Sequence, residues 1–235
     1  MEDSHRMIFN FATRKVAIIA ATAIAFSMTT VAFAGGPDRM AMPSEPSQST
    51  NHLWSAIIST GYTNYSHMYA GDGQTPIARL AIARSFKTTA SHWGFGIETG
   101  VQTGNTMRLE NSQATFNLLG AFSPIQTTVK PMLDLLLTAK KSFSDNPLFL
   151  IGKAGIAYRR WQFDNVNTIN DLSEINAEAQ MGVGYQINER TDLDFLYQGI
   201  FGGNPNFTAN IATGTGHVSD IPIQQGACLS LSVGV

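Results

Sequence analysis

Four histidines follow residue 50, and they are the first candidates for acid–base or nucleophilic chemistry. They are His52, His67, His92 and His217. Nucleophilic catalysis needs a base within reach of a serine or cysteine, and a third group that orients the base. None of these histidines has a serine and a carboxylate at a spacing that the alternation of a strand would place together. The sequence therefore predicts no catalytic residues and no enzymatic activity.

Cys228 is the only cysteine of the chain, so an intrachain disulfide is excluded. A reactive thiol needs a lowered pKa, which a nearby cation usually supplies. No cationic neighbour is evident in the sequence, and the alternation of the surrounding segment turns Cys228 to the inner face. We expect a buried, inert thiol.

The segment 162–173 concentrates side-chain oxygen atoms that could serve as Ca²⁺ ligands. Its acidic and amide residues are Asp164, Asn165, Asn167, Asn170 and Asp171. Their spacing is not that of an EF-hand, and Asn and Asp are also common turn residues. No glycine-rich phosphate loop precedes a helix, and no basic and aromatic patch indicates nucleic acid. We therefore expect no metal, no cofactor and no nucleic-acid partner.

The alternation of apolar and polar residues between 174 and 201 indicates the kind of element that positions these side chains. Every second residue from Ile175 to Ile187 is apolar or aromatic, and the residues between them are polar or glycine. A period of two predicts a strand with one apolar face and one wet face. Because the alternation resumes after a polar turn at 188–190, the segment predicts a long antiparallel hairpin.

Six further segments show a similar alternation, and the links between the expected strands alternate in length. The eight expected strands are 52–62, 77–86, 92–102, 129–142, 148–161, 174–187, 191–201 and 221–235. Three links are short, at 86–92, 142–148 and 187–191, whereas those at 63–76, 103–128, 162–173 and 202–220 are long. Transmembrane barrels of bacteria have an even strand number, short periplasmic turns and long external loops. The predicted fold is an all-β, eight-stranded antiparallel up-and-down transmembrane barrel.

One face of each expected strand is apolar and is predicted to contact lipid. If the amino end is periplasmic, Trp54, Phe86, Trp93 and Tyr185 fall near the inner rim, and Tyr62, Tyr158 and Phe201 near the outer rim. Aromatic rings gather at the two interfaces of membrane barrels, because one end of the ring is apolar and the other is wet. These seven residues are therefore predicted to form two aromatic girdles.

The opposite face carries five basic and five acidic residues. They are Arg79, Glu98, Lys130, Asp134, Lys140, Lys153, Arg159, Glu178, Asp192 and Asp194. Simple hairpin register puts Arg79 roughly across from Glu98, and Lys153 roughly across from Glu178. A barrel of eight strands is only wide enough for side chains to fill it, and buried charges require partners. The favoured interpretation is a plug of paired charges, while the many small interior residues keep a narrow pore open as the alternative.

The first 50 residues have a different composition. Arg6, Arg14 and Lys15 precede an apolar run, and Ala32-Phe33-Ala34 supplies a cleavage motif. Residues 1–34 are therefore predicted to be a secretory signal peptide, and the Pro- and Ser-rich residues 35–50 a flexible periplasmic leader. The barrel is expected to span 51–235. The net charge of −2 for the whole chain gives no basic bias.

Three stretches carry a resemblance to a known family: 146–163, 177–201 and 221–235. Gly-Lys-Ala-Gly-Ile-Ala-Tyr at 152–158 and Gly-Val-Gly-Tyr-Gln-Ile at 182–187 look like central strands of opacity-type surface antigens. The chain resembles the small outer-membrane β-barrels of Gram-negative bacteria, the opacity-protein-like and outer-membrane-protein-A-like barrels. The resemblance implies a location in the outer membrane, contact with its lipids, assembly by the barrel-assembly machinery and a monomeric state.

Two long loops are the candidates for any binding function, because loops on a rigid scaffold usually carry it. Loop 103–128 contains Leu118, Leu119 and Phe122, which are too apolar for a freely solvated loop and indicate an interaction site. Loop 202–220 is polar and rich in glycine. The leading hypothesis is a non-enzymatic surface protein that serves envelope integrity, or adhesion to host or environmental ligands.

Three other functions remain as alternatives. A narrow, porin-like pore for ions or small solutes would need unpaired interior charges. A lipid-modifying outer-membrane enzyme would need a catalytic group that the sequence does not reveal. A soluble, lipocalin-like barrel in the periplasm would not stay in the membrane fraction.

Overall fold

The computed structural model describes residues 53–86, 92–109, 126–143, 146–163, 170–205, 207–210 and 215–235. The predicted signal peptide, the predicted leader and the candidate loop residues Leu118, Leu119 and Phe122 lie outside the described residues. Within the described part of the chain, no helix is long and apolar enough to cross a membrane.

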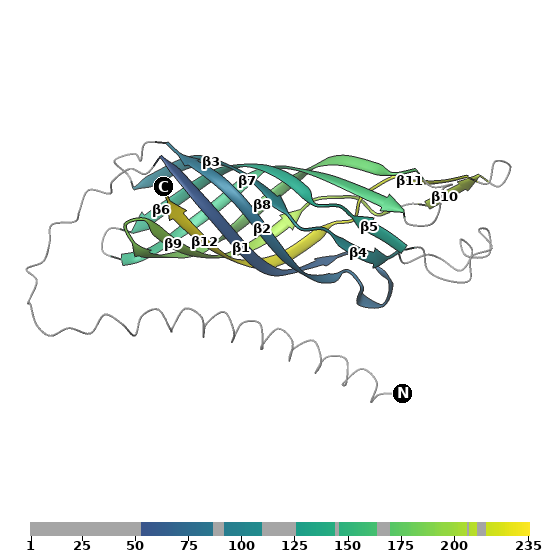
Figure 1. The fold of residues 1–235 in the computed structure, drawn as a ribbon, viewed down its shortest axis with the longest axis horizontal. Coiled ribbons are helices and arrows are strands. Elements are labelled where there is room, and N and C mark those ends of the chain that lie inside the picture. Colours follow the sequence, from purple (N-terminus) through teal and green to yellow (C-terminus); the bar gives the residue numbers. More distant parts are fainter. Residues whose placement is uncertain are drawn as a thin grey trace, which may run out of the picture. The chain divides into compact units, whose positions relative to one another are not determined.

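Eight long strands form one closed antiparallel sheet (Figure 1). They are β1 (Trp54–Tyr65), β2 (Gln74–Ser85), β3 (Trp93–Gln102), β6 (Met132–Phe143), β7 (Asn146–Phe163), β8 (Leu172–Asn188), β9 (Thr191–Ile200) and β12 (Gln224–Gly234). Each strand pairs with the next in this order, and β12 pairs back with β1 from Ser55↔Gly234 to Tyr65↔Gln224. The predicted all-β, eight-stranded barrel is confirmed, and each observed strand overlaps one expected segment.

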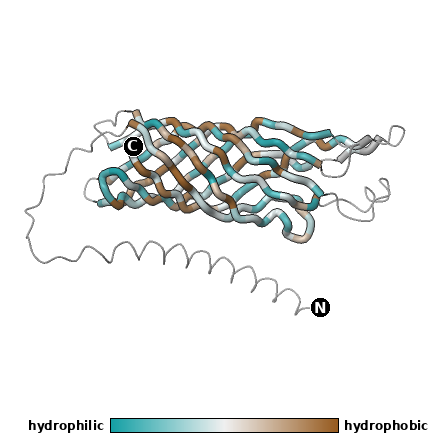
Figure 2. The backbone as a smooth tube through the Cα atoms, in the orientation of Figure 1, coloured by the Kyte–Doolittle hydropathy of each residue, from teal (hydrophilic) through white to brown (hydrophobic). Residues whose placement is uncertain are grey.

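The alternating residues of each strand point to opposite sides of the barrel wall. In β8 the residues at Ile175, Met181, Val183, Tyr185 and Ile187 are exposed on the outer surface, whereas Glu178, Gln180 and Gly184 are buried. Figure 2 shows the apolar residues spread along the barrel wall. Because only closure pairs every strand edge, this arrangement leaves no unpaired edge in an apolar environment.

The two ends of the barrel differ. The chain enters β1 and leaves β12 at one end, where Glu189 and Arg190 also form the tight turn between β8 and β9. We call this the turn end, and the opposite end the loop end. The carboxyl terminus lies at the turn end, and the strands β4, β5, β10 and β11 lie at the loop end (Figure 1).

Additional short elements at the loop end were not predicted. They are β4 (Asn105–Arg108), β5 (Gln126–Val129), β10 (Phe207–Asn210), β11 (Thr215–Val218) and the 3₁₀ helix η1 (Tyr69–Gly71). β4 pairs with β5, β5 extends the sheet along the end of β7, and β10 pairs with β11. A break at Lys130–Pro131 separates β5 from β6, because proline has no N–H to donate to the ladder.

Candidate functional site in the barrel interior

An ion-pair network crosses the middle of the barrel. Arg79 donates to Asp134 through two nitrogens, with Nε 2.7 Å from Oδ2, and its Nη1 lies 2.5 Å from Glu98 Oε1. Lys153 donates to both oxygens of Glu98, at 2.8 and 3.1 Å. Each of these four residues is at most 4% exposed. Two carboxylates are thus compensated by two cations, which is the condition for burying charge at low cost.

The register explains why these contacts differ from simple hairpin pairing. Arg79 lies opposite Gln102 in the β2–β3 ladder, and Ala83 lies opposite Glu98, so Arg79 reaches Glu98 diagonally. Lys153 lies opposite Gln180 and forms its ion pair with Glu98 rather than with Glu178. Neither expected register is met: Glu98 lies four residues from the partner of Arg79, and Glu178 lies two residues from the partner of Lys153. Interior side chains of strands that do not pair can meet inside a narrow barrel.

A layer of amides lies beside the ion pairs, toward the loop end. Glu178 accepts hydrogen bonds from Gln180 and Gln198 at 2.7 Å each, and Gln198 also donates to Gln102 at 3.1 Å. Arg159, fully buried, donates to Asn176 Oδ1 at 2.8 Å and to the carbonyl of Pro222 at 2.7 Å. Arg159 is therefore held by neutral oxygen atoms.

Beyond the amide layer, an apolar cluster fills the loop end. It comprises Tyr65, Met68, Met107, Leu109, Val129, Trp161, Phe163, Val218 and Ile221. Trp161 is fully buried, and its ring centroid lies 5.1 Å from that of Phe163. The sequence contains a signal for part of this cluster, because Trp161 and Phe163 follow Arg159 at every second position and therefore face inward with it. We call these nine residues the loop-end cluster.

The remaining predicted interior charges lie elsewhere. Lys140 and Asp192 form an ion pair of 2.7 Å near the turn end, where both side chains are partly exposed. Asp194 is 4% exposed, and its Oδ1 has no hydrogen-bond partner among the described residues. Lys130 lies in the break between β5 and β6, where its backbone N–H donates to the carbonyl of Arg160.

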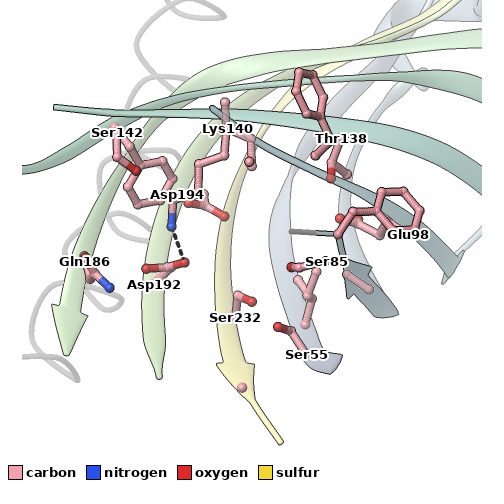
Figure 3. A pocket seen from close by; sticks show the side chains of 18 of the residues that line it. Ser55, Ser85, Glu98, Thr138, Lys140, Ser142, Gln186, Asp192, Asp194 and Ser232 are labelled. Atoms are coloured by element: carbon pink, nitrogen blue, oxygen red, sulfur yellow. Dashed lines mark hydrogen bonds and ion pairs between the residues drawn. The ribbon is translucent and has the colours of Figure 1, made fainter. Parts of the chain in front are cut away.

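The turn-end half of the interior is hollow. A cavity of about 580 Å³ extends from Ser85, Glu189 and Arg190 at the strand ends to Glu98, Lys153 and Asp194 at its inner end. Figure 3 shows Lys140 and Asp192 joined in this cavity, with Ser55 and Ser232 on neighbouring strands. We call this space the turn-end cavity.

The seven predicted girdle residues lie on the outer surface of the barrel. Trp54, Phe86, Trp93 and Tyr185 are exposed at the turn end, Tyr158 and Phe201 are exposed toward the loop end, and Tyr62 is half-buried there. Arg84 lies 5.4 Å from the ring centroid of Trp54, so this outward cation packs on an aromatic face.

The groups that could do chemistry are dispersed. Of the described histidines, His92 lies at the turn end, whereas His67 and His217 lie at the loop end, and all three are exposed. Cys228 is buried. Among the described residues, no group of three or more His, Cys, Asp or Glu residues could hold a metal ion.

One exposed ion pair orders the loop end. Arg108 of β4 donates through Nε to Asp72 at 2.5 Å and through Nη2 at 2.9 Å. The guanidinium also lies 4.9 Å from the ring centroid of Tyr69. The hydrogen bond from Arg108 lowers the pKa of Asp72 below its usual range. The pair joins the β1–β2 connection to β4.

These features define the class of protein. A closed eight-stranded barrel with a largely apolar outer wall, aromatic residues toward both ends and buried ion pairs in its interior is a transmembrane β-barrel of the bacterial outer membrane.

Known structures of the same class are similar to this chain. No protein-family model matches the sequence, and no curated protein matches it. OprG from Pseudomonas aeruginosa is 11% identical, with 77% of this chain and 96% of that chain covered and a TM-score of 0.49. Ail of Yersinia pestis is 11% identical, with 77% and 97% covered and a TM-score of 0.43. Neisserial surface protein A is 12% identical, with 77% and 96% covered and a TM-score of 0.41.

Proposed function

We propose that the protein is a non-enzymatic surface barrel that serves envelope integrity or binds host or environmental molecules through its outer loops. The observation that supports this proposal is the blocked middle and loop end of the interior. Arg79, Glu98, Asp134 and Lys153 neutralise one another in the middle of the barrel, and the amide layer and the loop-end cluster fill the space beyond them. A barrel with such contents acts through its surface.

Single-channel conductance tests this proposal. The mature protein is refolded into a planar bilayer, and folding is checked by heat modifiability on a gel. A silent bilayer with folded protein is expected, because paired charges and apolar side chains occupy the water path. Discrete and reproducible current steps would contradict this proposal and show that the protein forms a pore.

The outer loops are the proposed binding elements. Residues 110–125 connect β4 to β5, and this hairpin is anchored on β7 from Thr127↔Phe163 to Val129↔Trp161. Deleting 110–125 should therefore leave a heat-modifiable barrel while removing adhesion to host cells or immobilised ligands. Deletion of 211–214, which connects β10 to β11, tests the second candidate loop in the same way. If neither deletion changes adhesion, the loop proposal fails.

The turn-end cavity favours one second function, a narrow pore. A pore would need the ion pairs of Glu98 to open, so replacing Glu98 by Gln or Lys153 by Gln should then change conductance and ion selectivity. Wild-type and variant bilayers that remain equally silent would exclude this function.

The proposed partners follow from the same geometry. The apolar wall supports contact with membrane lipids, and the barrel-assembly machinery is the proposed partner in biogenesis. Because β1 and β12 close the sheet, none of the eight long strands has a free edge for pairing with a second copy. This supports a monomer.

Expression without any change in lipid A or phospholipid composition would support the absence of lipid-modifying activity.

A further inference from the structure

The turn-end cavity is large enough to hold a small molecule. Its volume of about 580 Å³ lies within the range of roughly 300–1,000 Å³ that ligand pockets occupy. Its mouth is formed by strand ends and by the β8–β9 turn, and its inner end is closed by the buried ion pairs. A ligand would therefore enter from the turn end and stop at the level of Glu98 and Asp194.

Asp194 is a buried carboxylate of this cavity that takes no part in the ion pairs described above. Its side chain lines the inner end (Figure 3), the residue is 4% exposed, and Oδ1 has no hydrogen-bond partner among the described residues. A buried carboxylate oxygen without a donor is rare, because the lost hydration is not replaced. Because Asp194 lines the cavity, its carboxylate can accept a hydrogen bond from a donor that enters there.

The cations nearest to Asp194 are engaged elsewhere. Lys153 donates to both oxygens of Glu98, and Lys140 donates to Asp192 Oδ2 at 2.7 Å. Lys140 also lies 3.7 Å from the ring centroid of Phe149. The inner end of the cavity therefore keeps a carboxylate without an ion pair. Its mouth carries charges of both signs, because Lys140 is paired with Asp192, and Glu189 lies next to Arg190 in the β8–β9 turn.

The lining indicates the chemistry of the missing donor. Among the described residues no set of three metal-binding side chains exists, so Asp194 lacks the companions that a divalent metal requires. The side chains of Ile57, Phe149 and Ile151 supply an apolar wall, and the hydroxyls of Ser55 and Ser232 supply further hydrogen-bond partners. A charged donor with an apolar body fits both parts of this lining.

We propose that the turn-end cavity binds a small organic cation with one primary ammonium group, which pairs with Asp194, and an apolar body, which packs on Ile57, Phe149 and Ile151. One ammonium group is sufficient, because Asp194 is the buried carboxylate without an ion pair, whereas Asp192 at the mouth is already paired with Lys140.

Calorimetric titration of the folded full chain in detergent with 2-phenylethylamine tests this proposal. Saturable binding at one site is expected. Asp194→Asn should weaken it at least about tenfold, because a charge-assisted hydrogen bond is lost while the shape is kept. Asp171→Asn, which alters an exposed aspartate at the loop end, is the matched control and should bind as the wild type does. Equal binding by the Asp194→Asn protein, or no binding by the wild type, would overturn the proposal.

Two further comparisons distinguish binding in the turn-end cavity from nonspecific partition of the ligand into detergent. The neutral 2-phenylethanol and the anionic 3-phenylpropionate should both bind at least about tenfold more weakly than the amine, because neither supplies a charged donor. Ser232→Phe fills the cavity from β12 and should abolish binding in a protein that remains heat-modifiable. Comparable binding of all three compounds, or unchanged binding in the Ser232→Phe protein, would count against the site.

Discussion

Glu98 and Lys153 form an ion pair inside the barrel although their strands do not pair with each other. Glu98 lies on β3 and Lys153 on β7, with β6 between them, and the Nζ–Oε2 distance is 2.8 Å. Arg79, on the other neighbour of β3, binds the same carboxylate. The network therefore joins four neighbouring strands of the eight through side chains and fills the middle of the interior.

Removal of Arg79 should show how much this network contributes. Arg79→Met leaves Asp134 without its cation and Glu98 with only one, so the variant should lose about 3–5 kcal/mol of unfolding free energy. Urea unfolding in lipid vesicles, followed by tryptophan fluorescence, measures the loss. Arg160→Met is the control, because the pair with Asp171 is about half exposed and worth about 0–1 kcal/mol. Equal losses in both variants would contradict a central role for the interior ion pairs.

The three tryptophans should report two different environments. Trp54 and Trp93 are 47% and 40% exposed on the outer wall, whereas Trp161 is fully buried in the loop-end cluster. In vesicles of brominated lipid, the Trp161→Phe protein should lose most of its fluorescence relative to unbrominated vesicles. The double variant Trp54→Phe and Trp93→Phe should keep most of its fluorescence. Strong quenching of Trp161 would mean that the loop-end cluster is open to lipid.

The sequence could predict the barrel but not its internal contacts. Alternation in segments such as Ile175–Ile187 fixes which side chains face outward, because the parity of a strand is set by its covalent geometry. The partners of Lys153 depend on the shear of the closed barrel, which no single hairpin reveals. β4 and β10 are only four residues long. Such short segments give too little periodicity for detection.

The turn-end cavity could not be predicted from the sequence either. Two of its lining residues pack closely on Gly184, where a Cβ atom would lie 2.1 Å from Phe149 Cζ and 2.4 Å from Asp194 Oδ1. Glycine is therefore required here for space. Parity places Gly184, Phe149 and Asp194 on the inner face, yet only the register Leu148↔Tyr185 and Gly184↔Asp194 brings the three together.

Gly184→Ala should accordingly destabilise the barrel. The added methyl group forces Phe149 and Asp194 to move, and overpacking of this kind costs about 1–3 kcal/mol. The control is Gly199→Ala on β9, where a Cβ atom meets nothing within 4 Å. Urea unfolding of both variants in the same vesicles is the measurement. A Gly184→Ala protein as stable as the control would show that Phe149 relaxes without cost.

The ion pair of Asp72 and Arg108 should make the order of the loop end depend on pH. The guanidinium holds the pKa of Asp72 below its usual range, so folding favours the ionised carboxylate. The stabilisation is fully present above the ordinary pKa of aspartate, and it is lost as the pH falls through the lowered pKa. Proteolysis at the loop end should therefore increase in acid for the wild type. The Asp72→Asn protein, which lacks the titrating group, should be cleaved faster at neutral pH and show little further change in acid. An identical pH profile for both proteins would show that the pair does not order the loop end.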